Sequence, residues 1–184
     1  RHLEREGFSH VFVLSSPAEV EAAVVQRQPI WSNRKHEHGP FDILINNIGG
    51  RRDPTPIRDM PVERWRELVD LNLTSTFICT KIIGGAMVDR GEGGRVINIA
   101  SINAFVAGQN IGGRHYETAK GAVVQLTRAT VADWAPYGVT VNAICPGVFM
   151  TEPNLRWARE RPEVINGIKD RTPMGSFGEP KDLG

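Results

Sequence analysis

Residues 41–50 read Phe-Asp-Ile-Leu-Ile-Asn-Asn-Ile-Gly-Gly, and this stretch decides the fold. Its first half, Phe41–Asn46, is a short and nearly continuous apolar run, typical of a β-strand covered on both faces. The run ends in asparagines and glycines, which favour turns and let a backbone approach a ligand closely. The asparagine amides can bind a base, a ribose or a neighbouring strand. We therefore expect a buried parallel strand that ends in a turn or a binding loop.

Three further runs have the same apolar character: His10–Ser15, Arg95–Ala100 and Val139–Cys145. Between the runs, apolar spacing predicts helices over Pro17–Gln26, Pro61–Asp89, His115–Ala135 and Asn154–Asp170. Strands that alternate with helices over short connections predict an α/β fold, a doubly wound parallel sheet wrapped by helices. No linker divides the chain, so we expect residues 1–184 to form a single domain.

The overall composition excludes several classes of protein. The 184 residues carry 22 Lys and Arg against 21 Asp and Glu, so no charge excess points to nucleic acid or to a membrane surface. Two cysteines are too few for a disulfide scaffold and suit a reducing compartment. No apolar run approaches the ~18 residues of a membrane helix, and the first residues do not resemble a signal peptide. We expect a cytoplasmic globular protein with no nucleic-acid or membrane partner.

Polar residues follow the carboxyl ends of three predicted strands, the edge where α/β sheets bind their ligands. These segments are Asn46–Gly50, Ser101 and Pro146–Thr151. Taken singly, each is an ordinary turn, cap or strand end. Their succession at three neighbouring strand ends favours a binding site at this edge of the sheet.

Two predicted helices add polar residues to the same region. Tyr116 and Lys120 lie four residues apart and share a helix face, although a chance pair on a solvated helix has the same spacing. A cation beside a phenol favours the phenolate, which suits acid–base catalysis. Asn72 lies on the apolar stripe of the Pro61–Asp89 helix, where a buried amide must form a structural bond or join a polar relay.

With these motifs in this order, the chain resembles the short-chain dehydrogenase/reductase family from about His10 to Leu183. The family-like stretches are Asn46–Gly49, Leu71–Leu73, Ile97–Ser101, Tyr116–Lys120, Val141–Gly147 and Gly178–Pro180. The resemblance implies a Rossmann-like fold and hydride transfer between NAD or NADP and a small-molecule secondary alcohol or ketone. It also implies a homotetramer or homodimer, in which the second and third predicted helices meet a partner subunit.

The resemblance also implies a role for each matching residue. Tyr116 is implied to be the general acid/base, Lys120 to assist it and bind the nicotinamide ribose, and Ser101 to polarise the substrate oxygen. Asn72 is implied to position the water that links Lys120 to solvent. The implied cofactor-binding residues are Asn46, Ile48, Gly49, Tyr116, Lys120, Pro146, Gly147, Val148 and Thr151. We expect no metal site, because His36-Glu37-His38 has no further ligand at a suitable spacing.

Compared with the family, the chain lacks a Gly-rich turn after a first strand, two leading strands and a closing strand. In the family's order, the leading strands separate the His10–Ser15 strand from the Phe41–Asn46 strand. We therefore expect a doubly wound sheet that is incomplete at both ends, and a His10–Ser15 strand without a neighbour unless the pairing is rearranged. The alternative function is a non-catalytic interaction or structural protein. A weaker one is an epimerase or dehydratase that uses Tyr116 and Lys120.

Charged residues beside these motifs have two interpretations each. Arg51 and Arg52 follow the glycine turn and are interpreted as a solvated loop, with an anionic substrate or a cofactor phosphate as the alternative. Arg114 and His115 start the third helix, where they either face solvent or touch substrate. The connection that contains Gly108 is longer than the family usually has, which indicates a reshaped substrate mouth.

Overall fold

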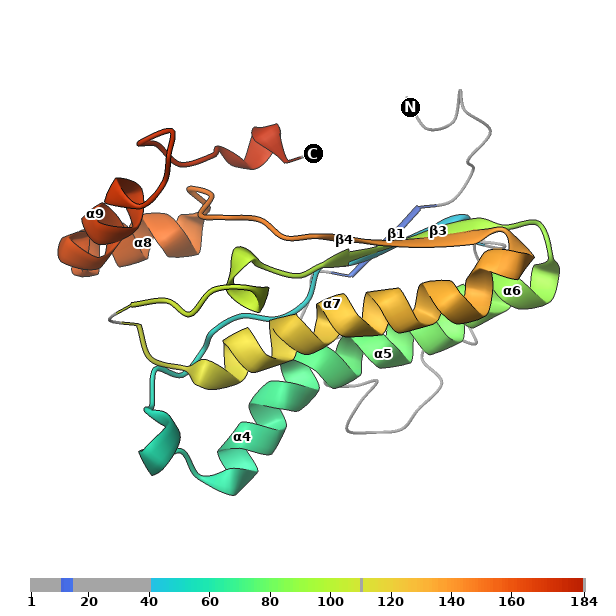
Figure 1. The fold of residues 1–184 in the computed structure, drawn as a ribbon, viewed down its shortest axis with the longest axis horizontal. Helices are drawn as coiled ribbons and strands as arrows, with labels where there is room; N and C mark the ends of the chain where they lie inside the picture. Colours follow the sequence, from blue (N-terminus) through green and yellow to red (C-terminus); the bar gives the residue numbers. More distant parts are fainter. Residues whose placement is uncertain (1–10, 15–40, 110, 184) are drawn as a thin grey trace.

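Four parallel strands form one sheet in the order β1-β2-β3-β4 (Figure 1). The computed structural model describes residues 11–14, 41–109 and 111–183 of the chain. The strands are β1 Val11–Leu14, β2 Ile43–Asn46, β3 Gly94–Ile99 and β4 Val139–Ile144. Each lies on one of the four apolar runs, so the predicted parallel sheet is confirmed.

Strand β1 is paired, which corrects the expectation that it would lack a neighbour. Val11 pairs with Ile43 and Leu14 pairs with Asn46 in parallel register. Unpaired backbone N–H and C=O groups are costly, and the edge of β2 offers the partners that β1 needs. The described sheet therefore runs directly from β1 to β2, the rearranged pairing that the sequence left open.

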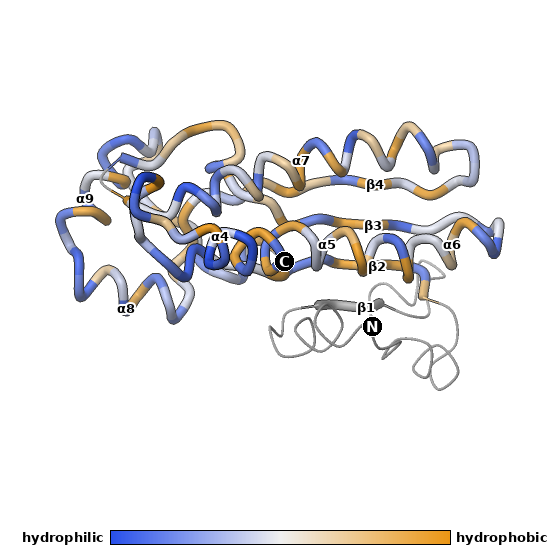
Figure 2. The backbone as a smooth tube through the Cα atoms, turned by 90° about the horizontal axis from the view of Figure 1, so that it is seen from below, coloured by the Kyte–Doolittle hydropathy of each residue, from blue (hydrophilic) through white to orange (hydrophobic). Residues whose placement is uncertain are grey.

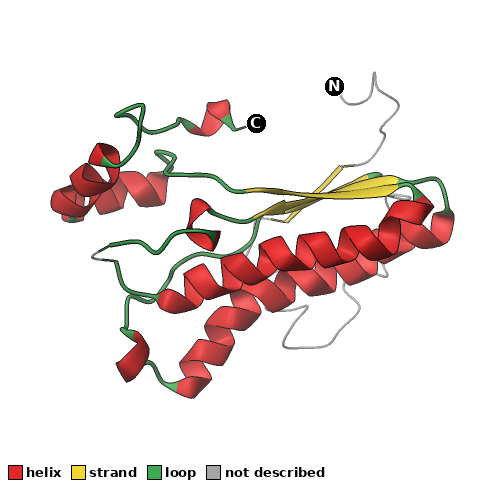
Figure 3. Cartoon of the chain, in the orientation of Figure 1, coloured by secondary structure: helices red, strands yellow, loops and turns green. Residues whose placement is uncertain are grey.

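Two long helices lie side by side on one face of the sheet (Figures 1 and 3). The first, Val62–Arg90, consists of three α-helical segments joined by two π-type turns. The segments are α4 Val62–Val69, α5 Ser75–Cys79 and α6 Gly85–Arg90, and the turns are Asp70–Thr74 and Thr80–Gly84. The second helix, α7, spans Arg114–Trp134, and hydropathy alternates along it (Figure 2). Both were predicted, whereas the predicted helix over Pro17–Gln26 lies outside the described residues.

The segment predicted as a single helix from Asn154 to Asp170 forms two helices instead. They are α8 Glu152–Glu160 and α9 Pro162–Asp170, which lie beyond the carboxyl end of β4 (Figure 1). The break falls at Arg161, where φ is −136° and ψ is 60°, because a residue before proline is disfavoured in the helical region. Short 3-10 helices lie at Ile57–Asp59, Ile102–Ala104, Ala135–Tyr137 and Pro180–Asp182.

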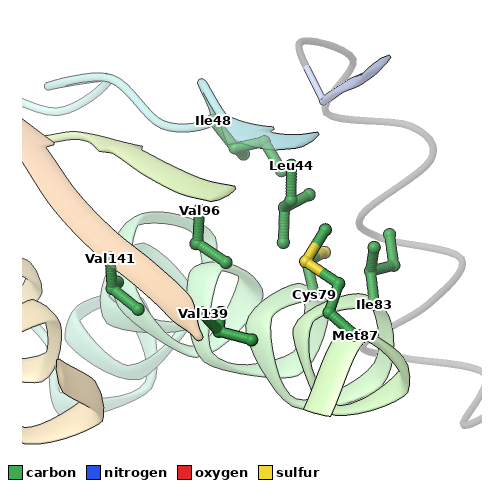
Figure 4. Close-up of a cluster of buried hydrophobic side chains, with 8 residues drawn as sticks. All are labelled: Leu44, Ile48, Cys79, Ile83, Met87, Val96, Val139 and Val141. Carbon is green, nitrogen blue, oxygen red and sulfur yellow. The ribbon is translucent and has the colours of Figure 1, made fainter. Parts of the chain in front are cut away.

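The core lies between the sheet and the Val62–Arg90 helix (Figure 4). Its buried side chains are Leu44, Ile48, Val96, Val139 and Val141 from the strands and their ends, and Cys79, Ile83 and Met87 from the helix. Burial raises the pKa of the Cys79 thiol to about 12, so this cysteine packs as an uncharged apolar group. The two helices approach closely at Gly84, where a Cβ would lie 2.5 Å from the Trp134 ring.

The Val62–Arg90 helix is long and apolar enough, by length and composition, to cross a membrane. This corrects the expectation from the sequence that no apolar stretch approaches the length of a membrane helix. Small and neutral residues between the large apolar ones extend the apolar window here. Of that window, 44% is buried inside the protein. The helix packs against the sheet and α7, which is the position of a core helix.

Candidate active site

Lys120 joins the ends of two strands. Its Nζ donates to the carbonyl oxygen of Ile99, the last residue of β3, at 2.7 Å and to that of Ile48, just after β2, at 3.1 Å. The lysine is 3% exposed, and this burial lowers the pKa of its ammonium to about 8, a shift that the neighbouring Cys145 opposes. An ammonium has three N–H groups, so two are used within the described residues and one is left for a further acceptor.

Tyr116 lies one helical turn before Lys120 and is half-buried. The Lys120 Nζ is 5.9 Å from the centre of the phenol ring, and the Arg51 guanidinium carbon is 4.9 Å from it. Two cations therefore lie close to one phenol. Both lie within the distance at which a cation is attracted to the face of an aromatic ring.

Ser101 follows β3 and is 7% exposed. Its Oγ accepts a hydrogen bond of 3.1 Å from the backbone N–H of Asn103. The next residue, Ile102, donates its N–H to the carbonyl oxygen of Pro146 at 2.9 Å, which ties the serine segment to the loop after β4. Within the described residues, Oγ is bonded only as an acceptor, which leaves the hydroxyl proton for a substrate oxygen.

Asn72 lies in the first π-type turn, fully buried, and holds the loop after β2. Its Oδ1 accepts from the Gly50 N–H at 2.8 Å, while its Nδ2 donates to the carbonyl oxygens of Gly50 at 3.1 Å and Leu68 at 2.8 Å. Gly49 has a φ of +125°, and a Cβ there would overlap Asn72 Oδ1, so the contact requires glycine. The water-positioning role of Asn72 stays a prediction.

The side chain of Asn46 lies in the interior rather than at the cofactor edge expected for it. Its Nδ2 donates to Thr80 Oγ1 at 3.0 Å and to Asn98 Oδ1 at 2.8 Å, and the residue is 1% exposed. Asn98 in turn donates to Thr127 Oγ1 in α7 at 2.9 Å. Of the partners that the sequence left open for this amide, the neighbouring strand is the one it meets.

The loop after β4 is held by the C-terminal segment. Gly178 donates its N–H to the carbonyl oxygen of Val148 at 3.2 Å, and Met150 donates to the carbonyl oxygen of Gly178 at 2.9 Å. The four residues assigned to the cofactor here are all half-buried or exposed: Pro146, Gly147, Val148 and Thr151. Their segment lies beside that of Ser101, so the predicted edge of the sheet is assembled from the ends of β2, β3 and β4.

Arg51 and His115 do not lie in solvated segments, which corrects two sequence interpretations. The Arg51 side chain is 21% exposed, and burial lowers the pKa of its guanidinium while Glu117 opposes that shift. His115 is fully buried, with its Nε2 2.8 Å from the carbonyl oxygen of Arg51. Arg52 is exposed, as the solvated-loop interpretation expects. The Arg51 guanidinium is half-buried because it binds Glu117 and carbonyl groups that are distant in the chain, and the local sequence does not reveal these partners.

Glu117 is a further site residue that the sequence motifs do not reveal. Its carboxylate is 11% exposed and accepts from the Gly108 N–H at 2.9 Å and from Arg114 Nη1 at 2.9 Å. It therefore holds the long connection before α7 against that helix. The signal was a single acidic residue directly after Tyr116, which is indistinguishable in sequence from a solvated helix position.

An open groove of about 720 Å³ lies beside these charges. It is lined by Pro56, Ile57, Ile111, Gly112 and Arg114. This volume is in the range of small-molecule sites, and its lining combines apolar side chains with one cation. No group of three or more His, Cys, Asp or Glu side chains forms a metal site in the described part of the chain, and His36-Glu37-His38 falls outside that part.

Residues 2–161 match the family described as short chain dehydrogenase. The chain belongs to the short-chain dehydrogenase family. It is 37% identical over 98% of its length to a 2-dehydro-3-deoxy-D-gluconate 5-dehydrogenase of Formosa agariphila, covering 65% of that protein. It is 39% identical over 78% of its length to a galactitol 2-dehydrogenase of Cereibacter sphaeroides, covering 56% of that protein.

Solved structures agree with this membership. A crystal structure of a Beutenbergia cavernae protein described as an NAD(P)-dependent gluconate 5-dehydrogenase, with NADP bound at low occupancy, superposes with a TM-score of 0.76 at 32% identity, over 91% of this chain and 64% of that one. The Rossmann-like α/β fold expected from the sequence is thereby confirmed. This short-chain dehydrogenase chain spans about two thirds or less of the length of the relatives named here.

Proposed function

We propose that the protein is an oxidoreductase that transfers a hydride between NAD or NADP and a secondary alcohol or ketone, with Tyr116 as general acid/base. The observation that carries the proposal is the buried Lys120 ammonium, which joins two strand ends beside the Tyr116 ring. Burying a cation is costly, so a lysine in this place favours a chemical role over a structural one. The relatives' names as dehydrogenases support this function over the non-catalytic and the epimerase or dehydratase alternatives.

The residues at this edge fit the nicotinamide and ribose end of such a cofactor. Lys120 has one ammonium N–H beyond its two bonds to carbonyl oxygens, which suits a ribose hydroxyl. Gly147 is exposed, with open space where a Cβ would be, so a flat ring can lie against its backbone. Thr151 offers an exposed hydroxyl on the same loop. When bound, the cofactor supplies the group that accepts or gives the hydride.

The chain's own residues move the proton. In alcohol oxidation, the Tyr116 phenolate oxygen accepts the proton of the substrate hydroxyl, and in ketone reduction the phenol returns it to the carbonyl oxygen. The Ser101 hydroxyl donates a hydrogen bond to that same substrate oxygen. The Lys120 ammonium and the Arg51 guanidinium lie beside the ring that carries this hydroxyl. Asn72 keeps the loop after β2 in place beneath the site.

We infer a homodimer or homotetramer in the cytoplasm, built as a single domain per subunit and joined through the two long helices. Apolar side chains on these helices are exposed, namely Phe77 at 47%, Ile82 at 42% and Val131 at 37%. A symmetric interface between copies would cover them. The two cysteines, which form no disulfide, suit a reducing compartment.

The test uses the full-length protein. Titration with NADH and NADPH, followed by cofactor fluorescence, measures binding and selects the cofactor. Turnover is then followed by absorbance of the reduced nicotinamide, with polyols, sugar acids and 3-ketoacyl thioesters as substrates. We expect saturable binding of one cofactor and turnover with a secondary hydroxyl or ketone. Absence of binding for both cofactors would overturn the proposal.

A further inference from the structure

The Arg51 guanidinium is bound by three separate segments of the site. Its Nη1 donates to the carbonyl oxygens of Gly112 at 2.7 Å and Gly113 at 3.1 Å. Its Nη2 donates to Asn103 Oδ1 at 3.2 Å and to Glu117 Oε1 at 3.4 Å. One side chain from the loop after β2 thus meets the loop after β3, the connection before α7 and the first turn of α7.

Each of these segments carries or adjoins a group of the proposed reaction. The N–H of Asn103 donates to Ser101 Oγ, so Asn103 connects the guanidinium to the serine hydroxyl. Gly113 immediately precedes α7, and its carbonyl oxygen accepts from the Tyr116 N–H at 3.1 Å. The guanidinium also lies over the Tyr116 ring, 4.9 Å from its centre. Arg51 is therefore placed between the two groups that would face the substrate oxygen.

The backbone before α7 packs so closely against the Arg51 loop that positions 112 and 113 accept only glycine. A Cβ at Gly112 would overlap the carbonyl oxygen of Pro54. Gly113 has a φ of +77°, and a Cβ there would lie 3.0 Å from Arg51 Cγ. The carbonyl oxygen of Arg51 itself meets His115 Nε2. The Arg51 loop and the start of α7 are thus joined through main-chain and side-chain atoms together.

We propose that Arg51 is a positioning residue, which sets the Tyr116 phenol and the Ser101 hydroxyl at a fixed separation. The inference rests on the proposed function, because it assigns these two groups to the same substrate oxygen. A guanidinium suits the task, since its planar fork binds two carbonyl oxygens and two side chains at once, which an ammonium cannot match. The four described bonds of its two terminal nitrogens match their four N–H groups, so in this arrangement these nitrogens serve the chain's own segments.

The first experiment compares Arg51→Gln with Arg52→Gln in the full-length protein. The two variants remove the same charge one residue apart, from a half-buried and from an exposed position. We expect Arg51→Gln to lower kcat on the order of 10²-fold, because misplaced reacting groups cost this much, with KM and the cofactor Kd unchanged. Arg52→Gln keeps the wild-type kcat. Arg51→Lys retains the charge without the fork and recovers part of the lost rate.

Two readouts separate positioning from a general structural role. Added guanidinium ion restores part of the kcat of Arg51→Ala, because the free ion occupies the vacated space, and it leaves Arg52→Ala unchanged. Incorporated fluorotyrosine reports the Tyr116 ring by fluorine NMR without any turnover. Its signal, assigned by its loss in Tyr116→Phe, shifts or broadens in Arg51→Gln, while the signal of the exposed Tyr137 does not.

The outcomes distinguish the two proposals. Equal kcat in Arg51→Gln and Arg52→Gln, or an unchanged Tyr116 signal in Arg51→Gln, would overturn the positioning role even where the wild type turns over substrate. A wild type that binds neither cofactor overturns the proposed function instead. The fluorine signal then still decides whether Arg51 orders the Tyr116 ring.

Discussion

Two buried polar sets of similar size lie on the same sheet and differ in what their hydrogen bonds leave free. The interior ladder consists of Thr80, Asn46, Asn98 and Thr127 and runs from the first helix through β2 and β3 to α7. The edge set consists of Asn72, Ser101, Tyr116 and Lys120 at the strand ends. Apart from the half-buried Tyr116, the members of both sets are almost fully buried, so burial does not tell a structural group from a reactive one.

The difference lies in the partners. The interior ladder bonds side chain to side chain, and Thr127 completes it by donating to the Val123 carbonyl oxygen in its own helix. In the edge set, Lys120 and Asn72 bond to backbone groups instead. That arrangement anchors each side chain to the fold while leaving a Lys120 N–H and the Ser101 hydroxyl proton for a ligand. Hence the edge set should govern turnover and the interior ladder should govern stability.

The largest expected effect is on turnover. Tyr116→Phe removes the hydroxyl that exchanges the proton, so kcat should fall on the order of 10³-fold, the range of general acid–base catalysis. Thermal stability and cofactor binding should not change. Tyr137→Phe is the matched control, because Tyr137 is 51% exposed and lies outside the edge set. A wild-type kcat in Tyr116→Phe would show that the edge set does not carry out the proton transfer.

The second effect is a pH dependence of stability that arises from Lys120. Its folded pKa is about 8 against an ordinary 10.5, so between these values the unfolded chain holds a proton that the folded chain does not. Stability therefore rises with pH through this window, whereas below pH 8 the cost of burying the charge is fully present. The gain is at most about 3 kcal/mol.

This gain is measured as the difference in unfolding free energy between wild type and Lys120→Met across pH 8 to 10.5. Lys120→Met also frees two carbonyl oxygens, so the slope with pH, and not the value at one pH, carries the result. We expect the difference to move in favour of the wild type as pH rises. Parallel curves would mean that the ammonium is as well solvated in the folded protein as in the unfolded chain.

The third effect concerns the interior ladder. Asn46→Ala leaves Asn98 Oδ1 without its donor and opens a space beside Thr80, which should lower the free energy of unfolding by about 1–3 kcal/mol. Asn47→Ala, one residue on and exposed, is the control and should change stability little. Urea unfolding measures both. If Asn46→Ala is fully folded and its kcat falls, Asn46 would instead belong to the edge set in function.

The contrast between the two sets also shows what the sequence could predict. Local patterns were sufficient for the strands, for the two long helices and for the Tyr116–Lys120 pair, because periodicity and i,i+4 spacing are local properties. The placement of the Asn46 side chain could not be predicted, since the local sequence is the same whether an asparagine at a strand end faces Asn98 or a ligand. Which partner it meets depends on register between β2 and β3, far apart in the chain.

Arg51 shows the same limit of local sequence, because a side chain expected in solvent is half-buried in the structure. Its surroundings in sequence are polar and glycine-rich, which predicts a solvated loop. Its partners Gly112 and Gly113 are more than sixty residues away, and only the packing of α7 on the sheet brings their carbonyl oxygens to the guanidinium. The pairing of β1 with β2 was likewise undetermined, because a strand's own residues do not specify its neighbour.

The smallest expected effect isolates a single bond of the interior ladder. Thr127 and Thr130 both lie buried in α7, and both donate to the carbonyl oxygen four residues earlier at 2.8 Å. Thr127 alone of the two accepts from Asn98 in the described contacts. Thr127→Val should therefore cost about 1 kcal/mol more than Thr130→Val, the net value of one buried hydrogen bond, with kcat unchanged in both. Equal losses would mean that the ladder ends at Asn98, whereas a kcat change confined to Thr127→Val would show that it reaches Lys120 through α7.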